Sequence, residues 1–190
     1  MAVKGAQTRA RLVEAARTLV EARGYHGTGL NDVIAAGSAP RGSLYHHFPG
    51  GKDQLTAEAL TVSGREITIV FADLADSAPD TRSLMESALS LLADRMEEAA
   101  YAKGCPVATV ALEVSARNDA LRQVCAEIYD RWQRVLADRL IADGRSPADA
   151  EDLACSLLAL TEGALILSRT RRSRAPMEQA RRTARALLDG

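Results

Sequence analysis

The chain has 190 residues and a nearly neutral composition, with 24 Lys and Arg against 25 Asp and Glu. This length allows one domain or two small ones, each with a buried core. Hydrophobic residues make up 47% and charged residues 26%, which excludes a disordered chain, and the low aromatic content of 4% beside abundant Ala, Leu and Arg favours helices over strands.

The charge is unevenly distributed along the chain. Residues 1–52 carry seven basic and three acidic side chains, a net charge of +4, whereas the remainder carries 17 basic and 22 acidic side chains, a net charge of −5. A basic N-terminal segment followed by an acidic remainder indicates a polyanionic partner for that segment, although a chance excess of basic residues gives the same numbers.

The first 52 residues predict three helices of about 17, 8 and 7 residues. Gly24 is expected to end the first helix, Thr28 to be the N-cap of the second, and Pro40 to lie in the first turn of the third. Leu44 and Phe48 are one turn apart and are expected to face the core. The first helix has one apolar face, made of Leu12, Ala16, Leu19 and Val20. With a tight turn before the third helix, this pattern predicts a helix-turn-helix unit.

Residues 53–190 show helical periodicity throughout, with breaks at Pro79, at 104–106, at Gly144 and at Pro176. No segment alternates with the period of a strand. We therefore predict an all-α protein of about nine helices, with a helix-turn-helix domain at 1–52 joined to a larger regulatory ligand-binding and dimerisation domain at 53–190.

The sequence predicts a soluble cytoplasmic protein without a membrane partner. It begins without the apolar core of a signal peptide, and its most apolar segment, 153–167, is too short to span a bilayer and contains Glu162.

The three cysteines, Cys105, Cys125 and Cys155, are too widely spaced for a disulfide framework or a C-x-x-C metal pair. We expect them reduced and buried on helix faces, with a thiol sensor as the alternative.

Residues 41–52 resemble several catalytic or nucleotide-binding patterns only in part. The P-loop pattern fails because His46 and Asp53 stand where it requires Gly and Ser or Thr. His46 and His47 are adjacent on a helix and diverge by about 100°, so they cannot chelate one metal together. No metal site and no cofactor are expected. Ser43 and His46 form half of a nucleophile–base pair without an orienting acid, so an all-α hydrolase is the unfavoured alternative and we predict that the chain is not an enzyme.

The same residues suit contact with duplex DNA. An Arg side chain such as Arg41 reads guanine in the major groove, while Ser, Tyr and Lys side chains bind phosphates. Gly42 leaves room for a close backbone approach, and Thr28 can offer its hydroxyl and helix-end N–H groups to a phosphate.

The pattern Thr28, Asp32-Val33-Ile34, Gly42-Ser43-Leu44-Tyr45-His46-His47-Phe48, Lys52 and Leu55 resembles the TetR family of bacterial transcriptional regulators, over residues 8–60. The resemblance implies that Arg41 reads a base and Tyr45 contacts a phosphate. His47 either packs between helices or contacts a phosphate. The full set of implied DNA contacts is Thr28, Arg41, Gly42, Ser43, Tyr45, His46, His47 and Lys52.

Two departures from the family pattern flank the third helix. The turn Ala36-Gly37-Ser38-Ala39-Pro40 is one residue longer than the family's Ala-Gly-Val-Ser, and one extra residue separates Phe48 from Lys52. These features, with the segments 104–108 and 111–113, are similar to the branch of drug- and flavonoid-responsive repressors of efflux and resistance genes. The extra residue leaves the reach of Lys52 open.

A single recognition helix binds too little DNA for operator specificity, so a homodimer on two half-sites is expected. The last two helices have more apolar surface than one protomer's core requires, which predicts a four-helix dimer interface, unless both helices only pack internally. The candidate residues are Leu153, Leu157, Leu160, Ala164, Leu167, Met177, Ala184 and Leu187.

The family resemblance also implies a pocket for a small-molecule effector among the helices of the larger domain. Its candidate lining residues are Phe71, Met85, Leu89, Met96, Val110, Tyr129, Trp132 and Leu158, although such residues are also ordinary core residues. The predicted function is therefore a DNA-binding transcriptional repressor that a small hydrophobic or aromatic ligand releases from its operator. The alternative is an architectural DNA-binding protein without ligand control.

Overall fold

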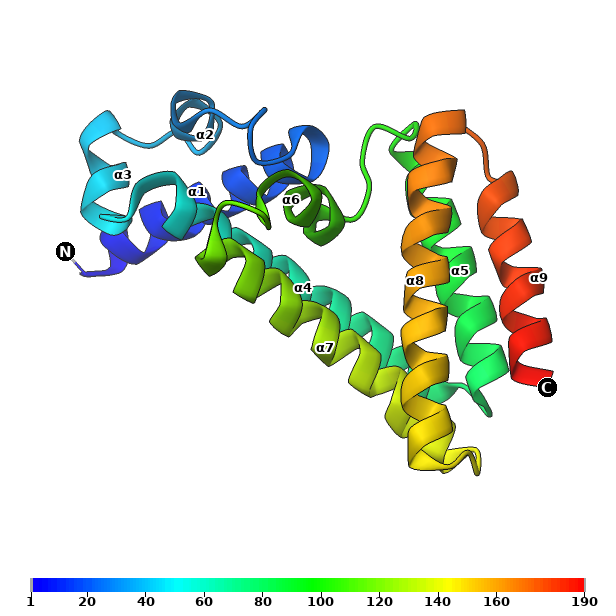
Figure 1. The fold of residues 1–190 in the computed structure, drawn as a ribbon. Helices are drawn as coiled ribbons and strands as arrows, with labels where there is room; N and C mark the ends of the chain where they lie inside the picture. The colour runs from blue at the N-terminus through cyan, green and yellow to red at the C-terminus, as the bar shows by residue number, and fades with distance from the viewer. Residues whose placement is uncertain (1, 190) are drawn as a thin grey trace. The chain divides into compact units, whose positions relative to one another are not determined.

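The computed structural model describes residues 2–189, with side chains from residue 5 onward, and within that range it contains helices and no strand (Figure 1). This confirms the predicted all-α class. No helix in the range combines the length and apolar character needed to cross a bilayer. The nine helices are α1 (Ala2–Arg23), α2 (Leu30–Ala36), α3 (Arg41–His47), α4 (Gly51–Ser77), α5 (Thr81–Glu98), α6 (Pro106–Val114), α7 (Asp119–Ala142), α8 (Pro147–Arg171) and α9 (Ala175–Asp189).

The helices form two compact units. The first comprises residues 1–65 and 106–128 and contains α1–α3 and α6; the second comprises 66–105 and 129–190 and contains α5, α8 and α9. Helices α4 and α7 contribute to both. Helix α4 continues through Lys52 without interruption, so the functional division predicted at that residue is not a backbone break.

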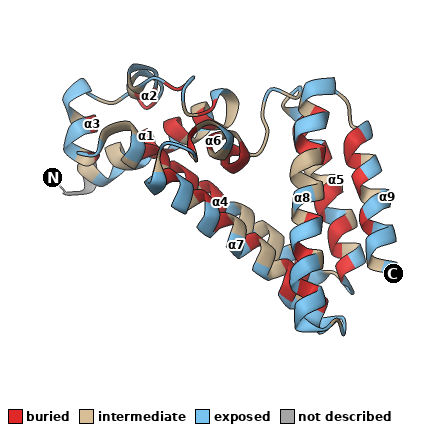
Figure 2. Ribbon diagram, in the orientation of Figure 1, coloured by how far each residue is buried: buried red, intermediate tan, exposed pale blue. Residues whose placement is uncertain are grey.

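The core of the first unit is made by α1, α2, α3 and the start of α4. Leu12, Val33, Leu44, Phe48 and Leu55 are all buried in it. Figure 2 shows buried positions in red along these helices. The apolar face predicted for the first helix and the inward orientation predicted for Leu44 and Phe48 are therefore confirmed. Because α3 has only seven residues, burying these two side chains fixes which face it turns outward.

Both of the predicted helix starts in this unit are displaced by one position. Gly29, not Thr28, is the N-cap of α2, and Pro40 is the N-cap of α3 instead of its first helical residue. The Thr28 hydroxyl donates a 2.7 Å hydrogen bond to the Gly24 carbonyl oxygen. Thr28 thus closes the turn after α1, because its side chain bonds backward along the chain and not forward into α2.

In the second unit α5, α8 and α9 lie side by side (Figure 1). Ser146 caps α8 as predicted by accepting a hydrogen bond from the Asp149 amide, and Asp80 caps α5 by accepting one from the Ser83 amide. The backbone and side-chain hydrogen bonds from Ser83 lower the pKa of Asp80. The core between these helices includes Leu84, Met85, Leu89, Met96, Leu157, Leu165, Met177, Ala180 and Ala184.

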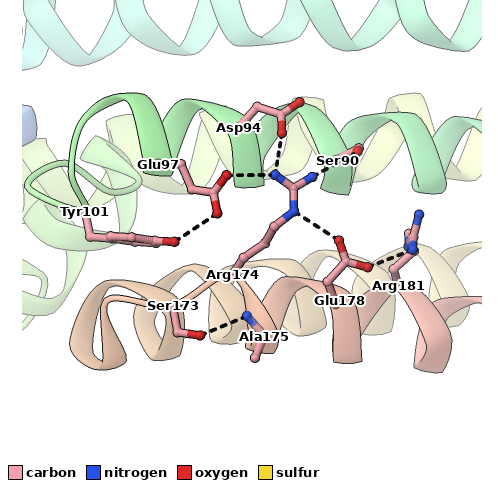
Figure 3. A network of polar contacts seen from close by, with 9 residues as sticks. All are labelled: Ser90, Asp94, Glu97, Tyr101, Ser173, Arg174, Ala175, Glu178 and Arg181. Carbon is pink, nitrogen blue, oxygen red and sulfur yellow. Dashed lines mark hydrogen bonds and ion pairs between the residues drawn. The ribbon is translucent and has the colours of Figure 1, made fainter.

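Arg174, in the turn between α8 and α9, ties that turn to α5 (Figure 3). Its guanidinium lies 2.5 Å from an Asp94 oxygen, 3.1 Å from a Glu97 oxygen and 3.1 Å from a Glu178 oxygen. Glu178 also pairs with Arg181 at 2.7 Å. One arginine therefore satisfies three carboxylates from two helices, which fixes the short turn against its neighbour.

Candidate nucleic-acid interface

Helix α3 has one buried and one exposed face. Leu44 and Phe48 are 0% exposed, whereas Tyr45 is 62% exposed. Arg41, Gly42 and His46 are exposed as well. The exposed face therefore contains a guanidinium, a phenol and an imidazole beside a residue without a side chain, and all three polar groups can donate hydrogen bonds to phosphates or base edges.

Arg41 is an exposed positive charge in the helix-turn-helix region. Arg9 pairs with Glu58, Arg17 with Glu14 and Arg23 with Asp32. Arg41 forms no ion pair with any residue that the structure describes, so its planar fork of donors is available for bidentate contact.

Ser43 and His46 do not form the pair that a hydrolase requires. The Ser43 hydroxyl donates a 2.6 Å hydrogen bond to the Pro40 carbonyl oxygen, at the start of its own helix. His46 instead contacts His47 edge to face, with 5.0 Å between ring centroids. Within residues 5–189, no three His, Cys, Asp or Glu side chains are arranged to hold a metal ion.

Four of the implied DNA contacts are buried or half-buried, namely Thr28, Ser43, His47 and Lys52. Thr28 is buried and its hydroxyl already donates a hydrogen bond to the Gly24 carbonyl oxygen, while its contact with a phosphate stays a prediction. His47 is half-buried. Lys52 is also half-buried, and its ammonium lies 4.3 Å from the centroid of the Tyr25 ring, within the range of a cation–π contact.

Tyr25 connects the turn after α1 to the start of α4. Its hydroxyl donates a 2.5 Å hydrogen bond to Asp53 Oδ1, and burial together with this bond raises the pKa of Tyr25 to about 12. Asp53 Oδ2 accepts a second bond, 2.9 Å long, from the side-chain amide of Asn118. The sequence does not single out these residues, since isolated polar side chains outside a motif give no pattern to detect.

The longer turn before α3 has a specific geometry. Ser38 has φ of 47°, in the left-handed region, and the Ala39 amide donates a 3.1 Å hydrogen bond to the Ile34 carbonyl oxygen. A Cβ on Gly37 would lie 3.2 Å from both the Arg11 and the Val33 carbonyl oxygens. Glycine at 37 thus allows the turn to lie directly against α1, and Ser38 takes the left-handed conformation that redirects the chain into α3.

The comparisons with known proteins agree with this geometry. Residues 12–59 match the family described as "Bacterial regulatory proteins, tetR family", and residues 82–183 match the "Transcriptional regulator LmrA/YxaF-like, C-terminal domain". The second match alone covers more than half of the chain. The chain belongs to the TetR family of bacterial transcriptional regulators. It is therefore a DNA-binding transcriptional regulator and not an enzyme, as predicted.

Individual relatives support the same assignment for this TetR-family regulator. An uncharacterized HTH-type transcriptional regulator of Mycobacterium tuberculosis is 35% identical over 185 residues, which is 95% of this chain and 93% of that protein. The HTH-type transcriptional regulator LmrA of Bacillus subtilis is 34% identical over 170 residues, 90% of each chain. Residues 82–183 therefore match the same C-terminal domain type that is named after LmrA and YxaF. Responsiveness to drugs or flavonoids stays a prediction for this protein.

Solved structures share the fold. A TetR transcriptional regulator from Chloroflexus aurantiacus superposes with a TM-score of 0.79 at 29% identity, covering 98% of this chain and 94% of that one. The reduced form of NemR from E. coli superposes with a TM-score of 0.82 at 21% identity, covering 95% of this chain and 96% of that one, and at that identity it supports the fold alone.

The predicted effector-lining residues of this TetR-family protein divide between core and partly buried positions. Met85, Leu89 and Met96 are buried in the core of the second unit, and Phe71 and Leu158 pack against that core. The indole N–H of buried Trp132 donates a 3.1 Å hydrogen bond to the Thr68 hydroxyl, and Tyr129 contacts the Trp132 ring edge to face at 5.5 Å. Val110 is buried in the first unit.

The predicted dimer residues need correction at four positions. Leu157, Ala164, Met177 and Ala184 are buried in the protomer's own core and cannot also form an intermolecular surface. The internal alternative stated for the last two helices therefore holds for these four. The remaining four are at least partly exposed: Leu153 and Leu160 are half-buried, and Leu167 and Leu187 are 44% and 42% exposed. Because α8 is apolar on several faces, its sequence pattern does not indicate which face is internal.

Proposed function

We propose that this regulator is a repressor that binds a palindromic operator as a homodimer and is released by a small hydrophobic or aromatic effector. A relative from a Mycobacterium species, 27% identical over 179 residues, is named "HTH-type transcriptional repressor DhaR", which supports the repressor assignment. We also retain the cytoplasmic location as a prediction, because a repressor acts where the chromosome lies.

The exposed face of α3 is the observation that carries the DNA-binding part of this proposal. We propose that Arg41 reads a base edge in the major groove and that Tyr45 and His46 bind phosphates. Gly42 brings the helix backbone close to the DNA. Ser43, His47 and Lys52 are peripheral contacts, because each is half-buried in the protomer.

Binding to the DNA upstream of the protein's own gene tests this proposal. Fluorescence anisotropy on that duplex should show nanomolar to tens-of-nanomolar affinity that falls with salt concentration. Arg41→Ala and Tyr45→Ala should each weaken binding by roughly tenfold or more, and Arg41→Ala should also relax base specificity at one position of each half-site.

Arg65→Ala is the matched control, since Arg65 is an exposed arginine of the first unit outside α3. It should leave operator affinity within about twofold of wild type. Unchanged affinity and salt dependence in both α3 variants would contradict the proposed recognition helix. Equal affinity for unrelated duplexes would favour the architectural alternative.

We place the dimer interface on the exposed apolar residues of α8 and α9. Ile166, Leu167 and Leu187 are 48%, 44% and 42% exposed in the protomer. Leu153 and Leu160 extend the same type of surface along α8. Burying these side chains between two copies removes apolar area from water, which is the main driving force for association.

Sedimentation velocity tests the interface. Wild-type protein should sediment as a dimer, and Leu167→Glu should shift it to a monomer because it places a charge in an apolar contact. Glu151→Gln, an exposed change on the same helix, should leave the dimer intact. A dimer that persists in Leu167→Glu and in Leu187→Glu would contradict this location.

The effector part of the proposal draws on four residues of the second unit. Phe71, Tyr129 and Leu158 are partly buried, and Trp132 is buried. We propose that Phe71, Tyr129, Trp132 and Leu158 line the site and that the effector favours a conformation whose recognition helices are mis-spaced for the operator. The expected coupling is about 1–3 kcal/mol. Fluorescence of Trp132, the chain's one tryptophan, reports binding directly. Operator release without a fluorescence change would contradict this location.

A further inference from the structure

Glu162 lies in the middle of α8 in the most apolar segment of the chain. Its Oε2 atom is buried and has no hydrogen-bond donor among the residues that the structure describes. The Cys105 thiol donates a hydrogen bond to its carboxyl group. A weak thiol donor is therefore the carboxyl group's identified partner, and half of the carboxyl's acceptor capacity is unused.

A buried carboxyl oxygen without a hydrogen-bond donor is energetically unfavourable in the free protein. Burying a carboxylate without a paired cation costs several kcal/mol in general, so the group tends to take up a proton instead. Burial raises the pKa of Glu162 to about 7, with the Cys105 hydrogen bond opposing the shift. A buried polar atom without a partner in a native structure calls for an explanation, and ligand binding is one of the recurring ones.

The chain segment 102–105 is bonded to α8 through Arg169. Arg169, seven residues after Glu162 and thus on the same side of the helix, donates a 3.1 Å hydrogen bond to the Ala102 carbonyl oxygen. A Cβ on Gly104 would lie 3.5 Å from Arg169 Nη1. Residues 102–105 therefore lie along the α8 face that contains Glu162, and this segment leads directly into α6.

Leu158 and Cys105 are partly buried and pack against the core of the second unit, and Leu165 belongs to that core. Leu158 and Leu165 lie one turn before and about one turn after Glu162 on α8. The carboxyl group is thus bordered by apolar side chains and by a thiol. A ligand that matches these surroundings needs an apolar body and one group that donates hydrogen bonds to a carboxylate, preferably with a positive charge.

We propose that Glu162 binds the ammonium group of an amine effector whose apolar body packs against the neighbouring side chains of the second unit. This inference rests on the proposed function, in which that unit binds the effector. The ammonium donates hydrogen bonds to Oε2 and neutralises the carboxylate. Binding is therefore favoured, because Oε2 has no hydrogen-bond donor in the free protein among the described residues. Where Glu162 is protonated beforehand, its proton is released to the solvent as the ammonium binds.

Two matched probes test the inference in the full-length protein. 2-Naphthylmethylamine is a cation at neutral pH, and 2-naphthylmethanol has the same ring with a neutral donor. Calorimetry should show the amine binding at least about tenfold more tightly than the alcohol to wild type, and Glu162→Gln should remove that difference. Glu151→Gln, which changes an exposed carboxylate of the same helix, should preserve it.

A second measurement uses wild-type protein alone and does not depend on the folding of any variant. Amine affinity should rise from about pH 6 to about pH 8, as Glu162 loses its proton, while alcohol affinity stays constant. Equal affinities for the two probes, amine affinity that is constant with pH, or no amine binding would each overturn the inference.

Operator binding by wild type, measured in the same preparations without probe, separates this inference from the proposed function. If the operator is bound but the amine is not preferred, the amine inference fails and the repressor proposal stands. If no duplex is bound specifically, the repressor proposal fails, whatever the amine result.

Discussion

The carboxylate of Glu113, in α6, accepts a 2.7 Å hydrogen bond from the backbone N–H of His26, in the turn after α1. These residues are 87 positions apart in sequence. Gly24 begins the same turn, and a Cβ at that position would lie 1.9 Å from Glu113 Oε1. The Glu113 side chain thus links α6 to the turn after α1, in a gap that a glycine leaves open.

Replacing Gly24 tests this docking. Gly24→Ala should destabilise the protein by about 1–3 kcal/mol, because φ at this position is +73° and because the added methyl group collides with Glu113. Glu113→Ala should cost roughly 0.5–1.5 kcal/mol by removing the bond to His26. The double variant should lose less stability than the sum of the two single losses, since without the Glu113 carboxylate the added methyl group has nothing to collide with. Urea unfolding measures the free energy of unfolding of all three variants. Strictly additive costs would contradict a direct contact.

Adjacent residues of α3 should separate stability from DNA binding. Leu44→Ala should lower the free energy of unfolding by about 2–5 kcal/mol, because Leu44 is fully buried. Tyr45→Ala should change it by less than about 0.5 kcal/mol, because Tyr45 is mostly exposed, while reducing operator affinity. Comparing urea unfolding with operator titration checks both. A large loss of stability in Tyr45→Ala would contradict the orientation of α3.

Two helical glycines should respond in opposite ways to alanine. A Cβ on Gly64 would lie 2.8 Å from the Ile128 side chain, so Gly64→Ala should destabilise the protein by up to about 2 kcal/mol through overpacking. A Cβ on Gly42 meets no atom within 4 Å, so Gly42→Ala should stabilise it by up to about 1 kcal/mol.

The same pair makes a distinct prediction for DNA binding. Gly42→Ala should weaken operator binding, because the methyl group occupies the space into which the DNA backbone is proposed to fit, whereas folded Gly64→Ala should bind normally. Titrations at a temperature where both variants are fully folded compare them. Undiminished affinity in Gly42→Ala would remove Gly42 from the interface.

Glu162 should make stability depend on pH in an unusual direction for a carboxyl group. Because its pKa is raised from 4.5 to about 7 by burial, the folded state binds the proton more tightly than the unfolded state does. This contribution stabilises the protein fully below about pH 4.5 and is lost as pH rises towards 7. Glu162→Gln should therefore gain roughly 1–3 kcal/mol over wild type on going from about pH 5 to about pH 8.

Urea unfolding of both proteins at several pH values measures this difference. Glu151→Gln serves as the exposed control and should show no such trend. A constant offset between Glu162→Gln and wild type across the range would mean that the carboxyl titrates normally in the folded state.

The three cysteines should differ in reactivity. Cys155 is exposed and Cys105 half-buried in the segment before α6, so the expectation that all three are buried on helix faces was wrong for these two. Cys125 is buried, and this burial raises the pKa of its thiol to about 11. In native protein at about pH 8, a disulfide reagent should modify Cys155 rapidly, Cys105 more slowly and Cys125 only after unfolding. Loss of the fast phase in Cys155→Ser assigns it.

Much of the fold was predictable because it follows from local patterns. Ser146-Pro147 marks a helix start through a side-chain cap and a fixed φ, and both operate within one turn. The spacing of Leu44 and Phe48 indicates a shared face without reference to any other element. The displaced start of α2 shows the limit of such signals, because Thr28 bonds to Gly24 and not to the helix that follows.

The candidate site was predictable only where it coincides with a motif. The residues of α3 are consecutive, so one helix presents them together. Tyr25, Asp53 and Asn118 come from three separate parts of the chain and meet only after folding. The dimer residues failed in part because α8 is apolar on several faces, and periodicity does not say which of them a protomer buries itself.

The sequence by itself determined the helical class, the position of the short helix α3 and the family, since these depend on spacing and residue type along the chain. Only the tertiary structure decided which apolar residues of α8 are internal, that Glu113 docks on the turn after α1, and that a carboxyl oxygen of Glu162 is buried. The physical reason is that burial and long-range hydrogen bonds depend on which segments pack together, and a pattern within one segment does not contain that information.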